Sequence, residues 1–319
     1  MKHILPLEFE PPFKSFSVYA NKQGIMLAQS EDAKCWIMSH YLGLMWNKIF
    51  IIEDSAVSFF DYGPLEISYY DTNAEILMSR PREFKETVKG FIRDGYYLWG
   101  YFNEISIPAS RAYKKNDNYH DYFIYGFSDE GELYSIGYTK VWRYEPYRFT
   151  FEEYIDSLIK FRSNDIRIML MKPTEGFEYR TDWNNIRRSI ENFLNSADIS
   201  RSPETKYSFG LRAQEAYLDY LCNEDGVSPN ILLKNSRMLM EYKALIHDVL
   251  REHPKYGMIR EMTEYCGLYD IYRLQHILSL KYTVKSDKDI IWTIKSHLKD
   301  AFKRECVVLE KLLECWGQL

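Results

Sequence analysis

The sequence lacks the patterns that mark most metal, nucleotide and disulfide sites. It has no CxxC pair, no HExxH spacing, no glycine-rich phosphate loop and no dinucleotide fingerprint. Its cysteines are odd in number and widely spaced: Cys35, Cys222, Cys266, Cys306 and Cys315. We therefore expect neither a disulfide framework nor a structural zinc site, and we interpret each thiol by default as buried and unpaired. No resident cofactor is predicted.

An excess of basic charge and long apolar runs are also missing. The chain has 41 Lys and Arg against 46 Asp and Glu, a formal net charge of −5, which argues against nucleic-acid binding. No apolar run reaches the roughly 18 residues that span a bilayer. The first twelve residues are broken by charge and proline, so we expect no signal peptide and a cytoplasmic location. A hydrophobic fraction of 46% and 319 residues suit one large globular domain or two of ordinary size.

The stretch that does carry a signal runs from Gln29 to Trp36. Cys35 follows Gln29 by six residues and directly precedes Trp36. Ser30 or Asp32 can cap a helix that begins just afterwards, which would place Cys35 in its first turn. A helix N-terminus favours a negative charge, so a reactive thiolate suits this position. The apolar residues 37–46 that follow predict a buried continuation of the helix.

The first half of the chain alternates strand-like and turn-like segments. We expect an irregular arm over residues 1–24 with a short strand at 15–19, then short strands or loops over 47–80 that include 49–52, 57–60 and 67–70. A helix opens at Pro81 and runs to about Arg93. Strands are predicted at 96–102, 120–127 and 132–139, the last two joined by a turn at 128–131. His120 opens a strand just after a polar loop, a position that can face a cleft.

From Thr150 the pattern becomes helical. A capping box at Thr150 predicts a helix to about Phe161, and a further strand is expected over 165–171. Helical periodicity then covers residues 182–196, 207–222, 231–252, 257–280 and 287–316. The predicted fold class is α+β, with an α+β domain containing an antiparallel sheet over 1–150 and a helical bundle over 151–319.

The order of Gln29, Cys35-Trp36 and His120 resembles the pattern of papain-like cysteine peptidases. The resemblance implies that Cys35 is the nucleophile, His120 the general base and Gln29 a donor to the oxyanion. A thiolate is a strong nucleophile when an imidazole lies within hydrogen-bond reach. A donor aimed at the developing oxyanion is worth roughly 3–4 kcal/mol.

The layout around the Tyr125-Gly126-Phe127 segment is similar to that of the butirosin biosynthesis protein H-like family of natural-product gene clusters. This resemblance implies a papain-like fold for the first domain and acyl or peptidyl transfer in secondary-metabolite biosynthesis, such as that of nonribosomal peptides. The donor would be the thioester of an acyl or peptidyl carrier protein, whose phosphopantetheine arm is the only cofactor involved. A small-molecule amine would accept the acyl group.

Residues near these positions provide candidate contacts for substrate or partner. Trp36, Trp99, Tyr101 and Asn103 are candidates for a substrate-binding wall, although strand packing explains the last three equally well. Lys114 and Lys115 fit either a solvated loop or a surface for an acidic carrier protein.

Two other functions stay open on the sequence alone. Papain-like enzymes orient the histidine with an Asn or Asp on the return strand, and residues 135–139 contain neither. Asp121 follows His120, but strand alternation predicts that it points to the opposite side. A catalytically inactive member that binds a carrier protein or peptide intermediate is one alternative. A thioesterase or peptidase, in which water resolves the acyl-enzyme, is the other.

Overall fold

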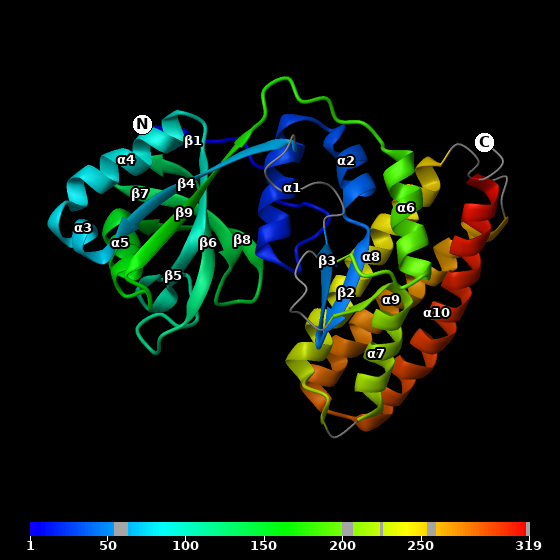
Figure 1. The fold of residues 1–319 in the computed structure, drawn as a ribbon. Helices are drawn as coiled ribbons and strands as arrows, with labels where there is room; N and C mark the ends of the chain where they lie inside the picture. Colours follow the sequence, from blue (N-terminus) through cyan, green and yellow to red (C-terminus); the bar gives the residue numbers. More distant parts are fainter. Residues whose placement is uncertain (54–62, 200–206, 224–225, 254–259, 317–319) are drawn as a thin grey trace. The chain divides into compact units, whose positions relative to one another are not determined.

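The computed structural model describes residues 1–53, 63–199, 207–223, 226–253 and 260–316 (Figure 1). Their contacts divide the chain into two compact units. The first comprises Met1–Ala33 and Val57–Glu178, and the second comprises Lys34–Ala56 and Tyr179–Leu319. The predicted boundary at 150/151 therefore falls inside the first unit. We describe each unit by itself.

A seven-stranded antiparallel sheet forms the centre of the first unit. Six strands lie in the order β4 (Leu65–Asn73), β9 (Asp165–Pro173), β5 (Tyr97–Asn103), β6 (Tyr119–Ser128), β7 (Glu132–Tyr138) and β8 (Tyr144–Thr150). The seventh strand, β1 (Lys2–Ile4), pairs with β6. The strands predicted at 96–102, 120–127, 132–139 and 165–171 are all present, and β8 is an addition.

Helices cover both faces of this sheet. On one face, α3 (Ala74–Ser79), α4 (Pro81–Arg93) and α5 (Phe151–Ile159) bury their apolar sides against residues such as Leu98, Phe102 and Ile124. On the other face, α1 (Ser17–Gln29) contributes Ala20 and Ile25 to a second cluster (Figure 1). Alternation along the strands supplies both cores, because neighbouring residues such as Leu170 and Met171 face opposite clusters.

Local sequence signals explain α4 and α5. Pro81 occupies the start of α4, and Phe84, Val88 and Ile92 are buried at intervals of one helical turn. The predicted capping box of α5 is complete, since the Thr150 side chain accepts from the Glu153 amide and the Glu153 side chain accepts from the Thr150 amide. Both helix predictions are confirmed.

The predicted strand at 15–19 is wrong, because residues 17–29 form α1. β-branched and aromatic residues favoured a strand locally, but packing of the N-terminal arm decides the outcome. The Glu8 amide donates to the Gly24 carbonyl at 3.0 Å, and a Cβ at Gly24 would lie 2.7 Å from the Glu8 carbonyl oxygen. Gly24 therefore allows close contact between the arm and a helix.

The second unit combines a small antiparallel sheet with helices. The sheet order is β10 (Ser208–Phe209), β2 (Gly43–Asn47) and β3 (Ile49–Glu53). The helices are α2 (Ala33–His40), whose first residue is counted in the first unit, α6 (Trp183–Leu194), α7 (Gly210–Cys222), α8 (Pro229–Glu252), α9 (Arg260–Lys285) and α10 (Lys288–Trp316). The helix predictions of the second half are confirmed, with ends that differ by up to five residues. Residues 257–259 of the predicted helix 257–280 lie outside the described residues.

The predicted helical continuation through residue 46 is wrong. Helix α2 ends at His40, and Gly43–Asn47 becomes a strand that pairs with β3 and β10. A short apolar run fits a buried strand as well as a buried helix, so periodicity could not separate the two. The Leu42 carbonyl between them accepts a hydrogen bond from the buried Tyr242 hydroxyl at 2.9 Å. The segments 49–52 and 67–70, each predicted as a short strand or a loop, are strands and belong to β3 and β4. The segment predicted at 57–60 lies outside the described residues.

The predicted α+β class is confirmed, with an antiparallel sheet in the N-terminal half and helices toward the C-terminus. Among the described residues, no helix combines the length and the apolar character required to cross a bilayer.

Candidate active site

His120 and Asp121 form an imidazole–carboxylate pair at the start of β6. His120 Nδ1 lies 2.8 Å from Asp121 Oδ1. The His120 side chain is 45% exposed and that of Asp121 only 12%. A half-exposed imidazole is thus held through one nitrogen by a largely buried carboxylate. This is the arrangement that orients a catalytic histidine.

The Asp121 carboxylate is itself fixed by two further donors. Ser17 Oγ donates to Asp121 Oδ2 at 2.5 Å, and Trp99 Nε1 donates to the same oxygen at 3.1 Å. Burial raises the pKa of the Asp121 carboxyl, but the hydrogen bonds and the charge of His120 outweigh it, so the pKa lies below its ordinary value. Asp121 is therefore an anion at neutral pH and a rigid partner for the imidazole.

The same pair controls the charge of His120. The hydrogen bond that His120 donates to Asp121 raises the pKa of His120 to about 9, with burial opposing and the charges of Asp121 and Glu104 adding to the rise. His120 is consequently an imidazolium through neutral pH. In this state Nδ1–H donates to Asp121, and the ring can give a proton to a leaving group.

The prediction that Asp121 points away from His120 is wrong. Strand alternation fixes the directions of the Cβ atoms, and Asp121 does lie opposite Tyr101 in the ladder while His120 lies opposite Phe102. His120, however, is the second residue of its strand, and its ring turns toward the next residue: Nδ1 also lies 3.2 Å from the Asp121 carbonyl oxygen. The orienting residue that the return strand lacks is thus the residue adjacent to His120.

Trp99 and Tyr101 of β5 lie beside this pair. The two rings pack edge to face at 5.1 Å with an interplanar angle of 69°, and Tyr101 is 50% exposed. Burial, together with the charge of Asp121, raises the pKa of the Tyr101 phenol. Trp99 therefore positions Asp121, and Tyr101 offers a neutral, half-exposed surface next to it.

Asn103 has a structural task in the loop between β5 and β6. Its side chain is 1% exposed, and its amide donates to Asp117 Oδ1 at 2.7 Å and to the Lys160 carbonyl at 3.1 Å. Its oxygen accepts from the Ile105 and Asn118 amides, each at 3.2 Å. These bonds shape the loop and the short 3-10 turn η1 (Glu104–Ser106) that precede His120, so we do not assign Asn103 a contact with substrate.

Cys35 is the third residue of α2, as the predicted position in a first helical turn requires. Ser39 fixes this helix within the second unit. Its Oγ donates to the Cys35 carbonyl at 2.7 Å and accepts from the Asp182 amide at 2.8 Å, while its carbonyl accepts from Asn185 Nδ2 at 2.6 Å. The Cys35 backbone is thereby tied to the start of α6, and its side chain is half-buried.

Trp36 stacks on His40 one turn along α2. The ring centroids are 3.6 Å apart with an interplanar angle of 19°, and His40 Nδ1 lies 2.8 Å from the Trp36 carbonyl. Burial lowers the pKa of His40, so this ring is neutral at physiological pH. A neutral imidazole stacks on the Trp36 indole. Trp36 thus has a packing role of its own.

Gln29 is the last residue of α1 and is exposed. Gln29, Trp99, Tyr101 and His120 belong to the first unit, whereas Cys35 and Trp36 belong to the second. The predicted set is therefore contributed by both units. A catalytic combination of Gln29, Cys35 and His120 stays a prediction.

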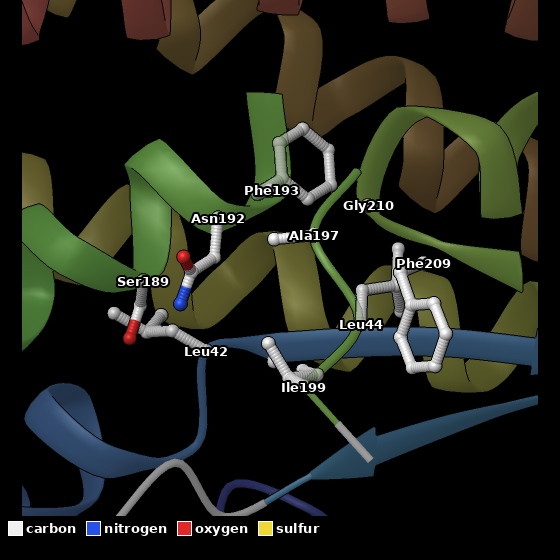
Figure 2. A pocket seen from close by; sticks show the side chains of 10 residues that line it. Leu42, Leu44, Ser189, Asn192, Phe193, Ala197, Ile199, Phe209 and Gly210 are labelled. Atoms are coloured by element: carbon white, nitrogen blue, oxygen red, sulfur yellow. The ribbon is translucent and has the colours of Figure 1, made fainter. Parts of the chain in front are cut away.

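The second unit also contains an apolar pocket (Figure 2). It is lined by Leu42, Gly43, Leu44, Ser189, Asn192, Phe193, Ala197, Ile199, Phe209 and Gly210. Gly210 has a φ of +51°, and a Cβ there would lie 2.0 Å from the Phe193 carbonyl oxygen. The lining contains no ionisable side chain, so the pocket offers no acid or base.

Comparison of the sequence with models of protein families and with curated proteins finds no match. Within the described residues, no three His, Cys, Asp or Glu side chains gather in a way that could hold a metal ion. The site must therefore be judged on its own geometry. The sequence predicted His120 as a site residue, excluded Asp121 because of strand alternation, and gave no indication of Ser17. The usable signal was the His-Asp dipeptide at a strand start opposite an aromatic strand.

Proposed function

We propose that this chain transfers an acyl or peptidyl group from a carrier-protein thioester to a small amine, with Cys35 as nucleophile and His120 as proton donor and acceptor. The observation that supports it most is the His120–Asp121 pair, because a base oriented by a third group accompanies activated nucleophiles. A papain-like arrangement is part of the proposal. Its support is a cysteine at a helix start and a histidine at the start of a strand in an antiparallel sheet.

The charge state of His120 fits the two steps of such a transfer. In the first, the Cys35 thiolate attacks the thioester carbonyl, the bond to the phosphopantetheine sulfur breaks, and this leaving thiolate takes a proton from the His120 imidazolium. In the second, the amine attacks the new thioester, neutral His120 accepts a proton from it, and the Cys35 thiolate leaves. Gln29 would donate to the oxyanion in both steps. A pKa of about 9 keeps His120 protonated before the first step.

The loop that leads into His120 suits an acidic partner. Arg111, Lys114 and Lys115 are exposed on it, and the Arg111 guanidinium covers the exposed Trp142 ring at 4.5 Å. Basic residues beside a reactive histidine would attract an acidic carrier protein and raise its rate of association. The proposal places this encounter in the cytoplasm.

The two rival functions differ from transfer in the fate of the acyl group. The inactive alternative rested on the missing orienting residue, and the Asp121 carboxylate beside His120 supports an active site instead. A thioesterase or peptidase would use the same residues with water in place of the amine. Transfer is the proposal because the family resemblance implies an amine acceptor.

We expect Cys35→Ala to lower amide formation by at least about 10³-fold when a panel of carrier-protein thioesters is offered with an amine, since the covalent step is lost. His120→Asn should cost a comparable amount. The double variant should be no slower than the slower single one, because residues that act as a unit are strongly non-additive. Product formation measured by mass spectrometry gives these rates.

Cys222→Ala is the matched control, because this thiol is exposed and lies at the end of α7. It should leave the rate unchanged. Unchanged turnover in Cys35→Ala, or fully additive losses in the double variant, would show that Cys35 and His120 do not perform one reaction.

A further inference from the structure

A second thiol–imidazole pair lies inside the helical unit, remote in sequence from Cys35 and His120. Nε2 of His247, on α8, lies 3.2 Å from Sγ of Cys266, on α9. This is hydrogen-bond distance for a sulfur–nitrogen pair. A thiol in contact with an imidazole can pass its proton to that ring, which is the usual route to a nucleophilic sulfur.

The His247 ring is held in an orientation that suits this transfer. Its Nδ1 lies 3.4 Å from Asp248 Oδ1, and its plane stacks on Tyr269 at 5.6 Å with an interplanar angle of 22°. The side chain is only 16% exposed. One nitrogen of the His247 ring therefore faces the Cys266 sulfur, and the other faces the Asp248 carboxylate. The imidazole lies between a thiol and a carboxylate, as a base does in a cysteine–histidine–aspartate set.

The surface of α9 beside this thiol is open. Cys266 is half-buried, and the adjacent Gly267 is exposed with open space where a side chain would stand. The charges of Asp248, Asp270 and Arg273 all act on the Tyr269 phenol, whose ring stacks on His247, and Asp270 pairs with Arg273 at 3.5 Å. The negative charge of Asp248, whose carboxylate lies beside His247, favours a neutral reagent over an anionic acyl donor.

We propose that Cys266 is a modification site at which hydroperoxides oxidise the thiol to a sulfenic acid, with His247 as the proton relay. The thiol proton first passes to His247. The sulfur then attacks one peroxide oxygen, so that an S–O bond forms, the O–O bond breaks, and the leaving oxygen takes the proton back from His247. The sulfur is oxidised, and the peroxide is reduced to water or an alcohol. This site is independent of the acyl-transfer proposal.

Cys306 provides a matched contrast in the same unit. It is half-buried like Cys266, but its sulfur lies 3.5 Å from the Glu310 carboxylate instead of an imidazole. Burial and the Glu310 carboxylate raise the pKa of Cys306 to about 11. Two thiols of similar exposure thus differ mainly in the group beside them.

The test is residue-resolved trapping of sulfenic acid with dimedone after brief exposure of the full chain to hydrogen peroxide. Each cysteine is compared with the same cysteine in urea. We expect Cys266 to be modified faster in the native chain than in urea, and Cys306 to be protected in the native chain. His247→Gln should slow Cys266 oxidation by about 10²-fold, the usual contribution of a positioned base. Cys35→Ala should leave it unchanged.

Protection of native Cys266 relative to urea would overturn the proposal and indicate a packing hydrogen bond only. This comparison needs no variant, so it stands even where His247→Gln disturbs folding. An unchanged Cys266 rate in a folded His247→Gln chain would equally contradict the relay. Loss of oxidation in Cys35→Ala would assign the chemistry to the other thiol.

Discussion

Replacing Lys243 with Met will lower the free energy of unfolding by about 3–5 kcal/mol, the usual cost of leaving one member of a buried ion pair without its partner. Lys243 and Glu305 are both 0% exposed, and their charged atoms lie 2.6 Å apart between α8 and α10. A carboxylate without its cation in this interior would lose most of its compensation for desolvation.

The environment of the pair explains why the loss should be large. Glu305 also accepts from Gln214 at 2.8 Å, from Tyr265 at 2.6 Å and from Tyr272 at 3.3 Å, so one carboxylate joins α7, α8, α9 and α10. Burial lowers the pKa of Lys243, and the Glu305 carboxylate opposes this shift. The Lys243 ammonium also lies over aromatic rings, 4.7 Å from the centroid of Tyr242 and 4.9 Å from that of Phe193.

Urea titration followed by circular dichroism measures the effect. The double variant Lys243→Met with Glu305→Gln should recover most of the loss, because the neutral amide needs no counter-charge and its one oxygen can still accept from Tyr265. Arg304→Met is the control, since the Arg304–Asp300 pair is on α10 too but is 49% and 65% exposed. It should cost no more than about 1 kcal/mol. An equal loss in Lys243→Met and Arg304→Met would contradict the role assigned to the buried pair.

Asp121→Asn should slow acyl transfer by up to about 10⁴-fold at neutral pH, because an amide neither orients nor stabilises the imidazolium as a carboxylate does. The same change should return the pKa of His120 from about 9 toward its ordinary value of 6.5. Nuclear magnetic resonance of the imidazole gives the pKa, and the transfer assay gives the rate.

The direction of the pH dependence follows from the raised pKa. The His120–Asp121 pair contributes stability that is fully present below about pH 6.5 and is lost as the pH rises through about 9. This dependence should disappear in Asp121→Asn. Asp129→Asn is the control, because this exposed carboxylate at the β6–β7 turn pairs with the N-terminal amine. A wild-type His120 pKa near 6.5 would contradict the claim that Asp121 keeps His120 protonated at neutral pH.

The elements that the sequence predicted well are those with a strong local signal. The helix at Pro81 has a favourable first residue and a regular apolar face, and that at Thr150 has its capping box. Where local preference and packing disagreed, prediction failed. Residues 15–19 favour a strand in isolation, yet a helix begins at Ser17. The N-terminal arm packs closely against this helix at Gly24.

The site was predictable only in part for similar reasons. The patterns around Cys35 and His120 placed one at a helix start and the other at a strand start, which is correct. Asp121 was dismissed because strand alternation describes Cβ directions and takes no account of how far an imidazole can turn. Glu305 lies within the apolar stripe of α10, and only the facing side chains from three other helices explain a buried carboxylate there.

The most direct test of the proposed function is the mass of the intact chain after incubation with an acyl-loaded carrier protein and no amine. The account predicts that the acyl group moves to the peptide that contains Cys35, that Cys35→Ala carries no adduct, and that Cys266→Ala still does. Adding amine should then remove the group as an amide instead of a free acid. An unacylated Cys35, or the same adduct on the Cys35→Ala chain, would contradict the account.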